Sequence, residues 1–442
     1  MIDFNPVFFK VKMKTLTVKK AKKVNGEIKA PGDKSVSHRS VMLGSIAQGK
    51  TTVKNFLKGD DCLRTMDAFK EMGIDIKEEK NGLLVIEGKG LRGLKKPSKP
   101  LYLGNSGTSM RLIMGILAGQ DFEAVLTGDE SLSKRPMKRV TEPLRLMGAN
   151  ITGKDDANFA PITIKGAKLT SINYRLPVSS AQVKSALILA GLYADDMTRI
   201  YEPAKSRDHT ERMLKLFGAK LDVERLCVKV HPGQVLSGKD IFVPGDISSA
   251  AFFIAAGVLV KGSKLLIKDV GLNPTRIGIV EILIKMGADI KIANLKNEEF
   301  EPYGDLVVKS SSLKACKIEG ELVPKAIDEF PILMVLSCFA KGVTEIKGVS
   351  ELRVKETDRI NSMVTNLTKM GAKIRVELDD IYIEGVDKLK AAQVNSFKDH
   401  RTAMAIAIAG LTCDGETVIE DTECIETSFP TFEADLRKIT AG

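Results

Sequence analysis

One short sequence motif recurs along the chain and constrains its fold more than any other feature. A hydrophobic helix end, a glycine and a strand-like run occur together at five places, at nearly even intervals. Glycine in this position is the usual left-handed terminator of a helix. After each motif come two runs of alternating apolar and polar residues joined by a short polar turn, and this pattern predicts a β-hairpin. The five glycines are Gly73, Gly148, Gly218, Gly287 and Gly371.

The two ends of the chain complete the series. The chain stops at Gly442, about one further interval after Gly371, so a sixth helix ends where its hairpin should begin. We predict that the alternating runs 15–18 and 27–30, which flank a lysine-rich turn, supply the missing hairpin. A single unit cannot bury its apolar face alone, so the units must stack into larger bodies. We therefore expect six units, with three in each of two domains.

A second repeated segment marks the division between the two domains. The turn Pro31-Gly32-Asp33 returns in the second half of the chain as Pro244-Gly245-Asp246, each time between a strand-like segment and an apolar helix. Its aspartate is suited to capping the helix that follows. The predicted hinge crossings lie near 31–33 and 244–246, with one domain at 32–244 and the other formed by 1–31 together with 245–442. The first residues, Met1–Val11, precede the first expected strand, so we expect them to be dispensable.

The composition narrows the classes of partner. The chain carries 67 Lys and Arg against 56 Asp and Glu, a net charge of +11, but only 5% of its residues are aromatic and none is Trp. Base-stacking surfaces therefore have little material, and small anions are better partners than nucleic acid. The longest apolar stretches, 250–260 and 330–340, are too short to cross a membrane. Six cysteines without C-x-x-C spacing indicate reduced thiols, and we expect a monomeric cytoplasmic protein.

Four predicted helix starts combine hydroxyl or glycine residues with cations. A helix N-terminus offers free N–H groups and a positive dipole, which favour phosphate or carboxylate. Taken singly, such residues are most often plain helix caps. Four of them at the same phase of the repeat indicate helix N-termini gathered around one anion site. They are Asp33–Arg39, Leu103–Arg111, Leu176–Ser185 and Lys205–Thr210.

Denser charge appears in the second half of the chain. The segment Leu352–Arg359 is predicted to place Lys355 and Arg359 on one helical face, with Glu356 beside them. Asp328 and the run Asp399–Arg401 stand before apolar helices. A mixed-charge helix face is more often a solvated surface than a binding site. These residues alone therefore do not identify a function.

Taken together and in this order, the motifs resemble those of the 5-enolpyruvylshikimate-3-phosphate synthase family. The resemblance runs from about Gly26 to Phe432. It implies an α/β fold of two domains, each an inside-out α/β barrel (a β/α prism) of three βαβαββ repeats, in agreement with the six units above. The motifs that carry it are Asp33–Arg39, Gly104–Thr108, Arg353–Arg359 and Asp399–Arg401.

The same resemblance implies a reaction and its substrates. In this family the enolpyruvyl group of phosphoenolpyruvate passes to the 5-hydroxyl of shikimate 3-phosphate by addition and elimination, without a metal or an organic cofactor. The reaction belongs to the shikimate pathway of aromatic amino acid biosynthesis and is the target of the herbicide glyphosate. Two phosphates and two carboxylates bring a charge of about −5 to −6 to the site. The matched positions supply seven cations against it.

Individual roles follow from the match to the family. Asp328 is the candidate acceptor of the 5-hydroxyl proton, Glu356 the candidate for proton transfer at the methylene carbon, and Lys34 a third catalytic residue. The positions that match the shikimate 3-phosphate site are Lys34, Ser35, Arg39, Ser180, Ala181, Gln182, Arg207, Asp328 and Lys355. Those that match the phosphoenolpyruvate site are Lys34, Gly107, Arg135, Gln182, Arg359 and Arg401.

Three positions depart from one branch of the family and match another. Ala181 stands where that branch has a second serine, Arg207 replaces a nearby tyrosine, and Thr427 replaces a lysine on the phosphoenolpyruvate side. The departures concern single contacts and leave the implied reaction unchanged.

Two alternatives remain open at this level. The sister transferase that acts on UDP-N-acetylglucosamine shares the fold, but it carries a Lys-Asn pair where this chain has Lys34-Ser35 and a reactive loop cysteine that neither Cys62 nor Cys227 matches. A non-catalytic protein that binds anionic metabolites or RNA is favoured only by the net charge. The four histidines show no H-E-x-x-H spacing, which argues against a zinc site.

Overall fold

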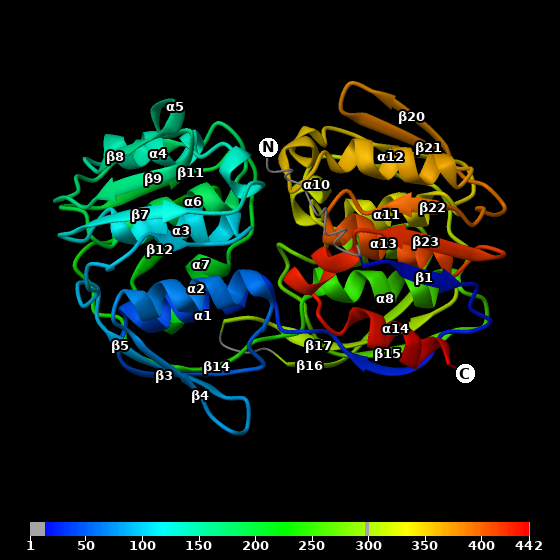
Figure 1. The fold of residues 1–442 in the computed structure, drawn as a ribbon, viewed down its shortest axis with the longest axis horizontal. Coiled ribbons are helices and arrows are strands. Elements are labelled where there is room, and N and C mark those ends of the chain that lie inside the picture. The colour runs from blue at the N-terminus through cyan, green and yellow to red at the C-terminus, as the bar shows by residue number, and fades with distance from the viewer. Residues whose placement is uncertain (1–13, 297–299, 442) are drawn as a thin grey trace, which may run out of the picture.

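The computed structural model describes residues 14–296 and 300–441, and the expectation for Met1–Val11 lies outside this range. The chain forms two bodies that lie side by side (Figure 1). The elements of the first body are α1 (Lys34–Ile46), β3 (Gln48–Lys54), α2 (Asp60–Glu71), β4 (Asp75–Glu78), β5 (Leu84–Lys89), β6 (Leu101–Tyr102), α3 (Gly107–Leu117), β7 (Glu123–Thr127), the 3-10 helix η1 (Leu132–Lys134), α4 (Lys138–Leu146), β8 (Asn150–Gly153), α5 (Lys154–Ala157), β9 (Phe159–Lys165), β10 (Asn173–Arg175), α6 (Ala181–Gly191), β11 (Thr198–Tyr201), α7 (His209–Leu216), β12 (Leu221–Glu224), β13 (Cys227–Val230) and β14 (Asp240–Phe242).

The second body joins the beginning of the described chain to its second half. Strand β1 therefore lies beside the last strands and far from α1 in the other body (Figure 1). Its elements are β1 (Leu16–Lys19), β2 (Asn25–Lys29), α8 (Ile247–Leu259), β15 (Lys264–Gly271), α9 (Gly278–Lys285), β16 (Asp289–Lys296), β17 (Tyr303–Lys309), β18 (Lys317–Ile318), α10 (Leu322–Lys325), α11 (Phe330–Ser337), β19 (Val343–Ile346), η2 (Ser350–Val354), α12 (Arg359–Lys369), β20 (Lys373–Glu377), β21 (Asp380–Glu384), β22 (Gln393–Asn395), α13 (His400–Gly410), β23 (Glu416–Glu420), η3 (Thr422–Thr427) and α14 (Phe432–Thr440).

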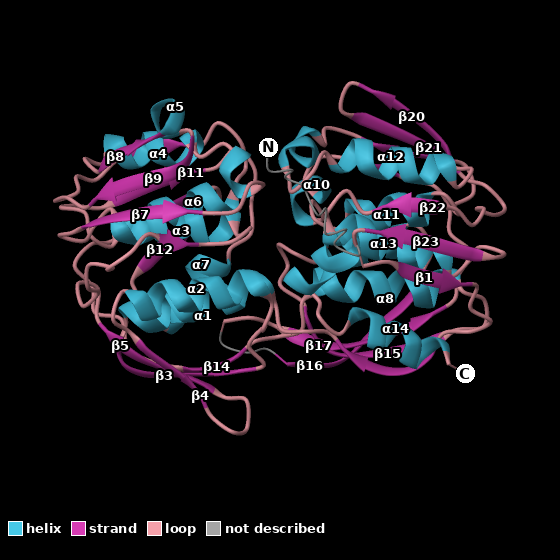
Figure 2. Ribbon diagram, in the orientation of Figure 1, coloured by secondary structure: helices cyan, strands magenta, loops and turns pink. Residues whose placement is uncertain are grey.

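The repeat is confirmed at each of its five glycines. They have φ values of 84°, 98°, 93°, 94° and 91° in sequence order, the left-handed conformation in which a side chain would be strained. The hairpins that follow are antiparallel pairs, for example β4 with β5, in which Ile76 faces Ile86. In the described part of the chain the strands form six small sheets, five of four strands and one of three. In each body, one sheet runs along the same side of the molecule: β3 and β14 lie beneath α1, and β15 and β17 lie beneath α8 (Figure 2).

The predicted N-terminal hairpin is wrong, because its two strands join different sheets. Strand β1 pairs antiparallel with β23, whereas β2 pairs parallel with β15. The connection between them is bound at both ends: the N–H of Ala21 donates to the carbonyl of Leu411, and the N–H of Val24 donates to Ser263 Oγ. The chain therefore spans two neighbouring sheets where the sequence suggested a closed turn, and only β1 completes the sixth unit.

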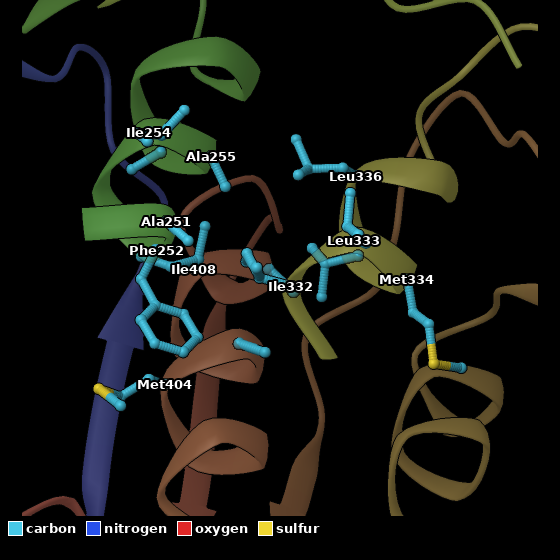
Figure 3. Packing of buried hydrophobic residues seen from close by; sticks show 14 of the residues in the cluster. Ala251, Phe252, Ile254, Ala255, Ile332, Leu333, Met334, Leu336, Met404 and Ile408 are labelled. Atoms are coloured by element: carbon cyan, nitrogen blue, oxygen red, sulfur yellow. The ribbon is translucent and has the colours of Figure 1, made fainter. Parts of the chain in front are cut away.

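Each of the two bodies has its own hydrophobic core. One consists of buried residues from 36 to 243 together with Phe300, and the other of residues from 16 to 30 and from 247 to 439. At the centre of the second core, α8, α11 and α13 pack through residues such as Ala251, Ile332 and Ile408 (Figure 3). These helices are buried nearly all round, as expected for helices enclosed by other elements. Within residues 14–296 and 300–441, no helix is long and apolar enough to cross a membrane.

The two crossings between the bodies are hydrogen-bonded to each other. Gly32 and Gly245 form an antiparallel bridge, and the N–H of Asp33 donates to the carbonyl of Pro244 at 2.7 Å. Each crossing runs from a strand of one body to a helix of the other, since β2 lies in a sheet of the second body before α1, and β14 lies in a sheet of the first body before α8. A Cβ on Gly32 would lie 2.0 Å from the carbonyl oxygen of Asn55, so only glycine fits here.

Candidate functional site

A cavity of about 760 Å³ lies between the two bodies, and every residue matched to the family site lines it. The lining includes the starts of all four predicted helices of the first body, α1, α3, α6 and α7, and the starts of α12 and α13 from the second. The matched residues on the wall are Lys34, Ser35, Arg39, Gly107, Arg135, Ser180, Ala181, Gln182, Arg207, Asp328, Lys355, Glu356, Arg359 and Arg401.

Local capping explains why these helices begin at the cavity. Asp33 Oδ1 accepts from the N–H of Val36 at the start of α1, and Ser106 Oγ accepts from Ser109 at the start of α3. Ser180 does the same for α6. A capped helix keeps its remaining N–H groups and its positive dipole directed outwards, so these N-termini favour an anion in the cavity. Capping and site formation are therefore two consequences of one local geometry.

The helix predicted to carry both Lys355 and Arg359 does not form as expected. The 3-10 helix η2 ends at Val354, and α12 begins only at Arg359, with Asp358 as its cap. Lys355 has an extended backbone with φ −83° and ψ −154°. The helix begins after Asp358 because Asp358 Oδ1 accepts a hydrogen bond from the N–H of Asn361 and caps α12. A continuous helix through Lys355 and Arg359 is therefore not formed. Lys355 and Glu356 therefore reach the cavity from a loop.

Positive charge dominates the cavity wall. Among the described residues, eleven Lys and Arg and six Asp and Glu line it, which leaves an excess of five positive charges. Four of the eleven cations were not matched to the family from the sequence. Arg111 stood in a motif but was given no role, and it lies one helical turn after Gly107 on α3. The other three, Arg139, Arg276 and Lys347, lie outside every motif that the sequence singled out.

Asp328 stands at the junction of the two bodies. Its carboxylate lies 2.7 Å from Arg207 Nη1 of the first body and 3.1 Å from Arg359 Nη1 of the second, with Lys355 Nζ at 3.7 Å. Burial alone raises the pKa of Asp328, but the positive charge of Arg207, Lys355 and their neighbours outweighs it and holds that pKa well below its usual range. The carboxyl group of Asp328 is therefore ionised at neutral pH.

Glu356 has a similar environment. Its Oε2 lies 2.6 Å from Arg359 Nη2, and its Oε1 lies 3.8 Å from Arg135 Nη1 of the first body. The effect of burial is again overcome, chiefly by Arg359 and Arg135, and the pKa of Glu356 is well below its usual range. The two carboxylates are thus both ionised, and the protein alone does not separate an acid from a base.

The two lysines of the cavity differ in their protonation. Lys34 Nζ lies 3.1 Å from Asp61 Oδ2, and the negative charge of Asp61 and Glu356 overcomes burial to raise the pKa of Lys34. The pKa of Lys355 is lowered instead, because burial and the charge of Arg359 outweigh the attraction of Asp328. Lys34 is accordingly a fixed positive charge, and Lys355 is the more readily deprotonated of the two.

Arg39 is held in place by the protein. Its Nε donates to Thr210 Oγ1 at 2.6 Å, its Nη1 to the carbonyl of Ser35 at 3.0 Å, and its Nη2 to Ser185 Oγ at 2.9 Å. Burial lowers the pKa of Arg39 to about 10. The guanidinium therefore stays charged at neutral pH.

Thr427, which replaces a lysine of the phosphoenolpyruvate side and has no assigned role, lies away from the cavity. Its Oγ1 donates to the carbonyl of Cys424 within η3, and its own carbonyl oxygen would lie 2.5 Å from a Cβ on Gly59. It is not among the described residues that line the cavity. Thr427 instead forms part of the contact between η3 and the start of α2.

The model of the EPSP synthase family, 3-phosphoshikimate 1-carboxyvinyltransferase, matches residues 18–436. The chain belongs to this family. A 3-phosphoshikimate 1-carboxyvinyltransferase of Geotalea uraniireducens (strain Rf4) is 54% identical over 427 residues, which are 97% of this chain and 99% of the relative. One of Geobacillus kaustophilus (strain HTA426) is 51% identical over 418 residues, 94% of this chain and 98% of the relative. A solved EPSP synthase structure from Acinetobacter baumannii has a TM-score of 0.86 at 45% identity and covers 96% of this chain and 98% of its own.

Membership of the EPSP synthase family confirms the fold class and the enzyme class expected from the motifs. The six small mixed sheets with their helices are the EPSP synthase fold. The activity is that of a 3-phosphoshikimate 1-carboxyvinyltransferase in the shikimate pathway of aromatic amino acid biosynthesis. The sister transferase and the non-catalytic binding protein are set aside.

Proposed function

We propose that this EPSP synthase transfers the enolpyruvyl group of phosphoenolpyruvate to the 5-hydroxyl of shikimate 3-phosphate in the cavity between its two bodies. In the addition, the 5-oxygen bonds to C2 of phosphoenolpyruvate, the hydroxyl loses its proton, and C3 gains one. In the elimination, C3 loses a proton and phosphate leaves C2. The observation that carries the proposal is the excess of five positive charges on a wall containing every matched residue. It balances the charge of about −5 to −6 on the two substrates.

On one side of the cavity we place shikimate 3-phosphate. The start of α6 supplies Ser180, the backbone of Ala181 and the side chain of Gln182 for its phosphate. Arg207 and Lys355 approach the same place from the two bodies, as their shared contact with Asp328 indicates. Ser35 and Arg39 hold the carboxylate, and arginine suits such a group because its planar fork can donate twice.

Phosphoenolpyruvate is assigned to the adjoining wall at the start of α3. Its proposed contacts are Lys34, Gly107, Arg135, Gln182, Arg359 and Arg401. A Cβ on Gly107 would lie 2.8 Å from Arg111 Nη1 and 3.3 Å from Arg135 Nη1. Glycine at this position therefore allows two guanidinium groups to approach the helix start, where the phosphate of the substrate would bind.

The two proton transfers are assigned to Asp328 and Glu356, with Lys34 as the fixed charge beside them. Both carboxylates have lowered pKa values because of neighbouring cations. Anionic substrates would draw Arg207 and Arg359 towards their own phosphates and carboxylates. The pKa of each carboxylate would then rise, and a group whose pKa lies nearer to neutral is the better general acid or base.

Closure of the two bodies is part of the same proposal. We divide the chain into domains at the paired crossings, 31–33 and 244–246, and assign the hinge to them. Among the described residues, the ion pairs that join the bodies at the cavity include Arg207 with Asp328, Arg135 with Glu356, and Arg139 with Glu351. We further propose a monomer in the cytoplasm, which the six free cysteines support.

The test is release of phosphate by the purified enzyme. Phosphate should appear with shikimate 3-phosphate and phosphoenolpyruvate together and with neither alone, and 5-enolpyruvylshikimate 3-phosphate should appear in equal amount. Release with UDP-N-acetylglucosamine in place of shikimate 3-phosphate, or with phosphoenolpyruvate alone, would overturn the proposal.

A further inference from the structure

A buried ionic cluster lies where the two crossings meet. At its centre is Arg276, between β15 and α9, with a side chain only 3% exposed. Its Nη1 donates to Asp33 Oδ2 at 3.2 Å, and its Nη2 donates to Asp246 Oδ1 at 3.2 Å and to Ser248 Oγ at 2.8 Å. A single guanidinium therefore joins the capping aspartates of α1 and α8, which begin in different bodies.

The cluster extends to the segment that carries Arg207. Arg276 Nη1 lies 3.2 Å from His209 Nε2, and His209 Nδ1 lies 2.6 Å from Glu301 Oε1. Donation by Arg276 to Nε2 requires that the ring proton of His209 sit on Nδ1 and be donated to Glu301. Asn273 Nδ2 donates to both Glu301 Oε2 and Asp208 Oδ1 at 2.9 Å. The residues of the second body thus bind the two positions that follow Arg207.

We propose that Arg276 is a positioning residue for the enolpyruvyl transfer. It fixes Asp33, and with it the adjacent Lys34, whose N–H also donates to Asp246 Oδ2 at 3.3 Å. Through His209 it fixes the start of α7 next to Arg207. The inference rests on the roles proposed above for Lys34 and Arg207, and it adds the device that holds both of them relative to the second body.

Arginine is suited to this position for a geometric reason. Its two Nη groups form a rigid fork that reaches two carboxylates and a ring nitrogen at once, whereas the ammonium of lysine is a single point. The carboxylates keep the group charged, since Asp33 and Asp246 raise the pKa of Arg276 in spite of its burial. Removing such a charge leaves buried carboxylates uncompensated, so the two helix starts should shift relative to each other.

The experiment compares Arg276→Lys and Arg276→Gln with the wild type, using kcat, the KM of each substrate and the Kd of shikimate 3-phosphate by calorimetry. Arg145→Gln is the control, because Arg145 also has an ion pair and two bonds to a backbone carbonyl but lies on α4 outside the cavity lining. In Arg276→Gln we expect kcat to fall about 10- to 100-fold, the cost of a small misplacement of reacting groups. The Kd should rise much less, Arg276→Lys should recover part of kcat, and the control should leave the kinetic constants unchanged.

Three results would overturn the proposal: a kcat of Arg276→Gln within twofold of wild type, a Kd that rises as much as kcat/KM falls with kcat unchanged, or no recovery in the lysine variant. The second result would mean direct contact with the substrate. If Arg276→Gln does not fold, Glu301→Gln tests the same cluster, and its effect on kcat should not add to that of Arg276→Lys. An inactive wild type would count against the proposed function and not against Arg276.

Discussion

The two bodies are built from the same repeat, yet they bring different chemistry to the cavity. The first contributes helix starts with small residues, such as Ser35, Gly107 and Ser180, and thereby binding groups. The second contributes both carboxylates assigned to proton transfer, Asp328 and Glu356. The halves meet at the pair between Arg207 and Asp328, 2.7 Å apart. On the proposed roles, proton transfer depends on carboxylates of the second body and substrate binding on groups from both, and this division requires the two bodies to come together.

The sharpest test of this division is Asp328→Asn in the second body. The change keeps the volume and removes the proposed base, so turnover should fall about 10²- to 10⁴-fold. Binding of shikimate 3-phosphate should be preserved, because Arg207 is then free of its carboxylate partner. Phosphate release and calorimetry measure the two effects. Asp414→Asn, an exposed partner of Lys20 on the surface, is the control and should behave as wild type. Near-normal turnover in Asp328→Asn would remove this residue from the mechanism.

The reciprocal change in the first body is Arg207→Gln. A charged hydrogen bond to a phosphate contributes about 1.5–3 kcal/mol, so the Kd of shikimate 3-phosphate should rise roughly 10- to 100-fold. The effect on kcat should be smaller than in Asp328→Asn. Arg199→Gln, on strand β11 outside the cavity lining, is the matched control. A fall in kcat with unchanged Kd would contradict the division between the bodies.

Gly107→Ala should have a moderate effect on the phosphoenolpyruvate side. The added methyl group would lie 2.8 Å from Arg111 Nη1, so this guanidinium must move. Glyphosate, assigned to this position by the family resemblance, should inhibit the wild type competitively with phosphoenolpyruvate. Its inhibition constant should rise about tenfold or more in the variant, because overpacking a close contact costs about 1–3 kcal/mol. The KM of phosphoenolpyruvate should rise less, and that of shikimate 3-phosphate serves as the internal control. If neither the inhibition constant nor the KM of phosphoenolpyruvate changes, Gly107 does not line that site.

The smallest effect concerns the pair between Arg139 and Glu351, which joins the bodies at half-exposed side chains. Exposed pairs contribute about 0.2–1 kcal/mol, so Glu351→Gln should change KM values by only a few fold.

Domain closure is tested by small-angle scattering. The wild type and the Glu351→Gln variant should both show a smaller radius of gyration with shikimate 3-phosphate and an unreactive phosphoenolpyruvate mimic than without them. An unchanged profile at saturation would argue against a hinge at the crossings.

Local patterns predicted much of this protein correctly. The glycines at helix ends, the hairpins after them and the capping aspartates depend on neighbours in the chain, and all appear where expected. The matched motifs also identified fourteen residues that share one cavity. Such features can be read from sequence because backbone conformation and capping are decided within a few residues.

The errors and omissions share a different cause. The partner of β2 is β15, a strand in the other half of the chain, and the sequence of β2 does not distinguish β1 from β15. Arg276 was missed because its flanking residues form no motif, and its importance arises from Asp33, Asp246 and His209 in distant segments.

The sequence by itself determined the repeat, its helix ends and the types of residue available for anion chemistry. Only the tertiary structure decided which strands pair, where the two bodies touch and how the charges act on one another. The pKa of Asp328 illustrates the reason: burial raises it and Arg207 of the other body lowers it, so its direction depends on distances across the cavity. Electrostatic effects follow separation in space and local solvation, and neither is a property of position along the chain.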